Sequence, residues 1–135
     1  MYEITADYCQ GAQFRAHARG HELITDQPVN NGGSDRGMTP PELFLASLGS
    51  CAAFYAVAYL KKKGLLREGV EVRASAEKVP APARLDSIHI DVEIPGGLSD
   101  ADRAGVEDAV HRCVIHNTIL HTPSVAIAIR TLAAV

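Results

Sequence analysis

The sequence predicts an α+β fold in which antiparallel sheets wrap around a buried central helix. Several short segments alternate apolar and polar residues, as strands with one solvated face do. One long apolar segment, Leu43 to Leu60, follows a helix-capping sequence. The predicted order is three strands, a helix, two strands, a second helix and a last strand, which is typical of α+β folds. The 135 residues suit a single domain, residues 1–135.

The first third of the chain is predicted to form an antiparallel meander. Apolar residues alternate from Tyr2 to Tyr8 and again from Ala12 to Ala18, and a third short run covers His21 to Thr25. Glycines separate these runs, as turns require. Residues 27–38 are rich in Gly, Asn and Asp and are predicted to form a loop.

A long helix is predicted from Thr39 to about Lys63. Thr39 can cap the first turn, Pro40 suits the first helical position, and Glu42 completes a capping box. Gly64 is a natural stop. The apolar segment approaches the roughly 20 residues that cross a bilayer. It is diluted with Ala, Ser and Gly, however, so we interpret it as a core helix and expect no membrane association.

The second half of the chain is predicted to contain three strands and an amphipathic helix. Strands are expected from Val70 to Val79 and from Leu85 to Ile94, with the isoleucines and valine of the second strand facing inward. Ser99 should cap a helix that runs to about His116 and carries Cys113 on its apolar stripe. A last strand is expected at residues 125–129.

Composition narrows the classes of partner. The formal net charge of -3 and the aromatic fraction of 5% without Trp favour neither phosphate binding nor base stacking, so no nucleic acid is expected. The N-terminus has no basic segment followed by an apolar one, so a cytoplasmic location is expected. The strands of one chain are too few to cover so apolar a helix. We therefore expect a homodimer that encloses both central helices.

Cys51 and Cys113 are the candidate reactive groups, although a free cysteine is often an inert core residue. Cys51 lies about three turns into the predicted helix, too far for the helix dipole to stabilise its thiolate. A reactive Cys51 would therefore need a cation from outside the helix. The candidates are Arg36 in the preceding loop and Arg15 or Arg19 on the early strands.

Glu42 has two interpretations from the residues alone. It could orient the arginine through a bidentate ion pair, or it could serve only the capping box. A zinc site is a rival interpretation for the second cysteine, because Cys113 lies among three histidines, His111, His116 and His121. His111 and His116 are five positions apart and would point in different directions on one helix. The residues therefore do not favour a metal site.

Two segments together resemble one family. GGSDRGMTPPELFLASLGSC (residues 32–51) and HRCVIHNTILHTPSVAIAI (residues 111–129) are similar to the two cysteine-bearing segments of the osmotically-induced-protein C / organic hydroperoxide resistance family. The resemblance implies an intertwined homodimer with active sites at the subunit interface, and a reaction that uses no metal and no bound cofactor. It implies that Cys51 attacks the hydroperoxide, that Cys113 resolves the resulting sulfenic acid, and that Glu42 pairs with an arginine. Cys9 has no counterpart and is expected to pack in a strand.

The expected function is a thiol-dependent reductase of organic hydroperoxides that uses a Cys51–Cys113 disulfide and a thiol or dihydrolipoyl reductant. Apolar residues such as Leu43, Leu48 and Phe54 are expected to line its pocket. The alternative is a non-catalytic protein of the same fold that binds a small apolar ligand. In that case both cysteines would stay reduced.

Overall fold

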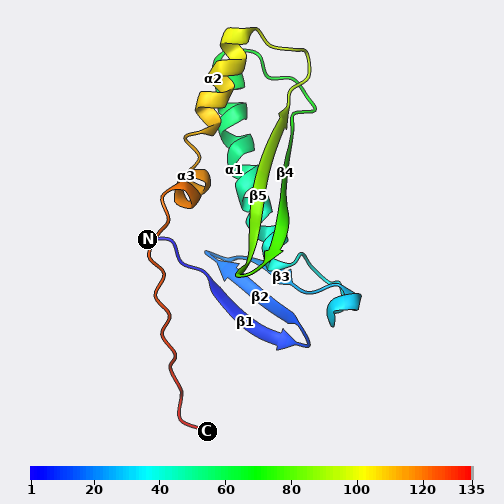
Figure 1. Ribbon diagram of the computed structural model, residues 1–135, viewed down its shortest axis with the longest axis vertical. Coiled ribbons are helices and arrows are strands. Elements are labelled where there is room, and N and C mark those ends of the chain that lie inside the picture. The colour runs from blue at the N-terminus through cyan, green and yellow to red at the C-terminus, as the bar shows by residue number, and fades with distance from the viewer. Residues whose placement is uncertain (135) are drawn as a thin grey trace.

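Figure 1 shows the computed structural model of the chain, which describes residues 1–134. Its elements follow in the order β1 (Thr5–Gln10), β2 (Gln13–Ala18), β3 (His21–Thr25), the short 3-10 helix η1 (Val29–Asn31), α1 (Pro40–Lys62), β4 (Glu71–Pro80), β5 (Ala83–Glu93), α2 (Asp100–Val110) and α3 (Val114–Leu120). The α+β prediction, with antiparallel sheets and one long helix, is confirmed.

The strands form two separate antiparallel sheets. β1, β2 and β3 make a meander in sequence order, and β4 and β5 make a hairpin. Along β5 the burial alternates as predicted, since Ile88, Ile90 and Val92 are half-buried while His89 and Asp91 are exposed. The meander lies at one end of the molecule and α2 at the other, with α1 and the hairpin between them (Figure 1).

The start and end of α1 match the capping prediction. The Glu42 backbone N–H donates to Thr39 Oγ1 at 3.4 Å, and the Thr39 N–H donates to Glu42 Oε2 at 2.9 Å. Both bonds satisfy N–H groups that the first helical turn leaves without partners. Gly64, at φ +67°, follows the last turn in a left-handed conformation that suits glycine.

One face of α1 forms the core of the chain. Leu48, Ala52, Ala56 and Leu60 repeat every four residues and are at most 1% exposed. Leu60 and Ala56 pack against Val106 of α2. Another part of α1 is uncovered, since the Phe54 side chain is 69% exposed. By length and composition α1 is apolar enough to cross a membrane, and 28% of its apolar window is buried within the described chain.

The predicted single helix from residue 99 to 116 is wrong, because the chain breaks between α2 and α3. Ser99 caps α2 as expected, but the helix ends at Val110. Cys113 has φ -56° and ψ 125°, which is not helical, and caps α3 instead. Its Sγ accepts the backbone N–H of His116 at 3.4 Å. The Cys113 side chain thus caps a new helix, α3, at a point where the apolar periodicity predicted that the first helix would continue.

The predicted last strand is not formed within one chain. Residues 121–134 have no regular secondary structure and run away from the rest of the molecule (Figure 1). Val125, Ile127 and Ile129 are 81–86% exposed. A strand requires a hydrogen-bonded neighbour, and the described residues provide none for this segment.

Candidate functional site

The two cysteines singled out by sequence lie together, although 62 positions separate them. α1 carries Cys51 in its central part, and the break before α3 carries Cys113. The two side chains are close enough for Cys51 to raise the pKa of the Cys113 thiol. Both are free thiols, with Cys51 half-buried and Cys113 fully buried.

The surroundings of Cys113 favour its neutral thiol. Burial is the main cause that raises its pKa above the ordinary value of 9.0, and the neighbouring Cys51 side chain adds to it. Backbone N–H groups of His116 and Ile115 act in the opposite direction by donating to the sulfur. The net result is a protonated, enclosed thiol next to a more accessible one.

The first candidate cation, Arg36, lies on a loop that is tied to the end of β3. Its backbone N–H donates to Asp26 Oδ2 at 3.0 Å. The Arg36 residue is exposed. Within residues 1–134 its guanidinium makes neither an ion pair nor a hydrogen bond, so it is free to bind an anion supplied from elsewhere.

The other predicted site residues are not gathered around Cys51 in one chain. Arg15, on β2, forms an ion pair with Glu22 of β3, with 3.9 Å between Arg15 Nε and Glu22 Oε2. The Glu42 carboxylate takes part in the capping box and has no arginine partner among the residues described. Glu42 also precedes Cys51 by nine positions on the same helix, a rise of roughly 13 Å. Their assigned roles therefore remain predictions.

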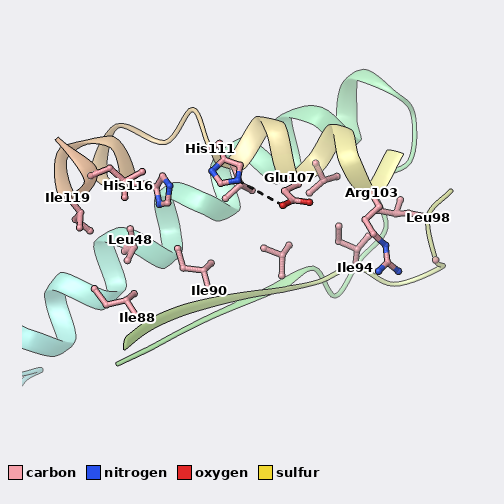
Figure 2. A pocket seen from close by; sticks show the side chains of 15 residues that line it. Leu48, Ile88, Ile90, Ile94, Leu98, Arg103, Glu107, His111, His116 and Ile119 are labelled. Carbon is pink, nitrogen blue, oxygen red and sulfur yellow. Dashed lines mark ion pairs between the residues drawn. The ribbon is translucent and has the colours of Figure 1, made fainter. Parts of the chain in front are cut away.

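An apolar groove runs between β5 and the helices α2 and α3 (Figure 2). Its volume is about 680 Å³, within the range of small-molecule sites. Leu48 lines it, together with the inward residues of β5, whereas Leu43 and Phe54 do not. Neither cysteine is part of the lining. Four polar side chains border one side of the groove: Arg103 and Glu107 of α2, His111 just after α2, and His116 of α3.

The histidines near Cys113 do not form a metal site. The rings of His111 and His116 stack edge-to-face with centroids 5.3 Å apart. Across residues 1–134, no three His, Cys, Asp or Glu side chains are grouped closely enough to hold a metal ion. The buried Nε2 of His116 lacks a hydrogen-bond partner in the described chain. Cys9, expected to pack in its strand, is instead exposed on β1.

The OsmC-like protein family model matches residues 32–128, which include both cysteines and most of the chain. The chain belongs to the OsmC-like family. Solved structures agree with this fold. A Psychrobacter arcticus structure, named for an osmotic stress induced and detoxification response, has 21% identity and a TM-score of 0.78, covering 87% of this chain and 88% of its own.

Two further OsmC structures have the same fold at low identity. An OsmC-like protein from Mycoplasma pneumoniae is 18% identical with a TM-score of 0.72, covering 90% of this chain and 89% of its own. A Legionella pneumophila organic hydroperoxide resistance protein OsmC is 18% identical with a TM-score of 0.65. The match covers 88% of this chain and 90% of that protein. A comparison with curated proteins finds no match. The family thus includes hydroperoxide-resistance proteins.

Sequence reasoning missed one buried polar residue near the loop of Arg36. Asp26 is only 1% exposed, and its carboxylate organises the loop that carries Arg36. A signal was available, because an aspartate between a strand and a Gly- and Asn-rich loop is a frequent acceptor for backbone N–H groups.

Proposed function

We propose that this OsmC-like protein is a thiol-dependent hydroperoxide reductase with Cys51 as the attacking residue. The observation that carries the proposal is the pair of neighbouring free thiols, one half-buried and one enclosed. Family membership supports it, since OsmC-like proteins include organic hydroperoxide resistance proteins.

The reaction follows from the difference between the two thiols. The Cys51 thiolate attacks the terminal oxygen of the hydroperoxide, the O–O bond breaks, and the alkoxide leaves as the alcohol after taking up a proton. Cys51 becomes a sulfenic acid. Cys113 then loses its proton and attacks the Cys51 sulfur, hydroxide leaves as water, and a disulfide forms. Two thiols of an external or dihydrolipoyl reductant restore both cysteines and become a disulfide themselves.

The proposed active form is a homodimer in which one copy completes the site of the other. A separation of roughly 13 Å along α1 prevents Glu42 from reaching the Cys51 of its own chain directly. A second copy could bring its helix start, with Glu42 and Arg36, to this Cys51. A second copy would bury three apolar surfaces of this chain. These are the exposed side chain of Phe54, the apolar groove, and the C-terminal tail, residues 121–134, which pairs with no strand among the described residues.

The test is the intact mass of the reduced protein after one equivalent of cumene hydroperoxide. We expect wild type to lose two hydrogens, Cys51→Ser to stay unoxidised, and Cys113→Ser to gain one or more oxygens. Cysteines that stay reduced would contradict the reductase. Faster consumption of hydrogen peroxide than of the alkyl hydroperoxide would contradict only the preference for organic substrates.

A non-catalytic binding protein is the second candidate. The observation favouring it is that the apolar groove contains neither cysteine, so a ligand held there need not react. A fluorescent fatty-acid analogue should then bind equally well to wild type and to Cys51→Ser, while peroxide leaves both thiols reduced. Loss of binding in Cys51→Ser would contradict this candidate.

A further inference from the structure

Asp26 is a buried carboxylate that the proposed reaction does not use. It follows β3 directly and is 1% exposed in a single chain. Burying a charge without partners is costly, so a buried carboxylate needs several hydrogen-bond donors. The donors around Asp26 therefore indicate what this residue stabilises.

Most of these donors belong to the backbone of the loop before α1. The Gln27 N–H donates to Oδ1 at 2.7 Å, the Arg36 N–H donates to Oδ2 at 3.0 Å, and the Ser34 N–H lies 3.3–3.4 Å from both oxygens. The Gln13 side chain also acts to lower the pKa of this carboxylate. Burial would raise the pKa of Asp26, but these hydrogen bonds together lower it below 3.8, so the carboxylate is ionised at neutral pH.

The rest of the loop packs tightly around this carboxylate. The Asp26 N–H donates to the Met38 carbonyl at 3.3 Å, and the Asp35 N–H donates to the Gln27 carbonyl at 3.0 Å. A Cβ at Gly33 would overlap the Gln27 carbonyl, and one at Gly37 would overlap that of Ile24. The backbone on both sides of Arg36 is thus held against the end of β3.

We propose that Asp26 is a positioning residue that holds Arg36 where it can stabilise the Cys51 thiolate of the partner copy. The inference rests on the proposed function. The carboxylate binds the Arg36 backbone, while the exposed guanidinium projects from the loop six positions before Glu42. The effect of Asp26 on Cys51 therefore passes entirely through Arg36.

The test is the pH profile of Cys51 alkylation in the full-length reduced protein, followed on the Cys51 peptide by mass spectrometry. Asp26→Asn keeps the size of the side chain but replaces one acceptor oxygen with a donor amide, which cannot accept the loop N–H groups. We expect the profile to move about one unit towards higher pH, the lower end of what losing a nearby opposite charge causes. A merely structural role would reduce stability without moving the profile.

A double-mutant cycle tests whether Arg36 carries the effect. Arg36→Ala alone should move the profile at least as far as Asp26→Asn, and adding Asp26→Asn to it should cause no further movement. Asp35→Asn is the matched control, because it removes the same charge from the same loop at an exposed residue. We expect its profile to coincide with wild type.

Two outcomes would overturn the inference. One is an unmoved profile in a folded Asp26→Asn protein, and the other is a shift that persists in full on the Arg36→Ala background. If Asp26→Asn does not fold, Gln13→Leu replaces it, since Gln13 helps to lower the pKa of the same carboxylate and lies outside the loop. Alkylation needs no peroxide, so a protein that fails to reduce cumene hydroperoxide contradicts the proposed function and not this inference.

Discussion

Cys51 and Cys113 are neighbours, yet their environments suit different chemical roles. The Cys51 residue is half-buried, so a reagent can approach it, whereas Cys113 is 0% exposed. Burial also raises the pKa of Cys113 above 9.0. A protected, protonated thiol suits the residue that acts second, because it does not compete for the peroxide.

Alkylation of the reduced protein should therefore distinguish the two thiols. At pH 8 we expect iodoacetamide to modify Cys51 at least tenfold faster than Cys113, since reaction requires an accessible thiolate. Because the pKa of Cys113 is raised, its modification should become appreciable only as the pH climbs past 9.0. Peptide-resolved mass spectrometry measures both rates. Equal rates at pH 8 would contradict the assignment.

Asp26 should make the free energy of unfolding depend on pH in the acidic range. Its pKa is lowered in the folded protein by backbone hydrogen bonds, against the opposing effect of burial. Its contribution is therefore complete above the unfolded value, near 3.8, and is lost as the pH falls through the lower folded value. Urea unfolding from pH 7 to pH 2 should show wild type more stable than Asp26→Asn at neutral pH. The difference should shrink below pH 3.8, and a constant difference would contradict this mechanism.

The contact between α1 and α2 depends on a glycine in the middle of a helix. A Cβ at Gly105 would overlap the Tyr59 ring. The Tyr59 hydroxyl donates to Asp102 Oδ1 at 2.9 Å, and the Ser99 hydroxyl donates to Asp102 Oδ2 at 2.8 Å. The hydrogen bond with Asp102 raises the pKa of Tyr59, so its hydroxyl stays a donor. Sequence alone gave no reason for a helix-disfavouring glycine here.

Gly105→Ala should destabilise the protein even though alanine favours helices. Alanine gains up to about 1 kcal/mol over glycine in a helix, but the displaced ring causes an overpacking cost of about 1–3 kcal/mol. In a Tyr59→Ala background the ring is absent, so the same substitution should stabilise by up to about 1 kcal/mol. Urea unfolding measures both effects. The same sign in both backgrounds would contradict the contact.

At the scale of the whole molecule, a single chain leaves too much apolar surface uncovered. The tail alternates Val125, Ile127 and Ile129, and α1 exposes Phe54. Alternation with a period of two is the pattern of a strand with one buried face. We infer that the tail joins the sheet of a second copy, where its backbone groups would find partners.

Ile127→Asp should therefore weaken the dimer. Burying an isoleucine side chain is worth about 1.5–3 kcal/mol, so we expect the dimer Kd to rise roughly 10- to 100-fold in sedimentation experiments. Ala126→Asp, on the opposite face of the extended segment, is the matched control and should have a smaller effect. A dimer that is indifferent to Ile127→Asp would exclude the tail from the interface.

Local signals in the sequence determined most of the elements. The capping box placed the start of α1 at Pro40, and period-two alternation located β5, because both depend on neighbours within a few positions. The two cysteines and the family were also recognisable from short motifs. Sequence reasoning failed at Cys113, where the same apolar periodicity continues through a break between two helices.

Only the tertiary structure decided which of these residues meet. The Cys51–Cys113 and Tyr59–Gly105 contacts join segments that are distant along the chain. The tail shows the same dependence, since residues 125–129 have the pattern of a strand but no neighbouring strand in their own chain. A pattern of side chains determines which face is apolar, whereas packing determines what that face contacts.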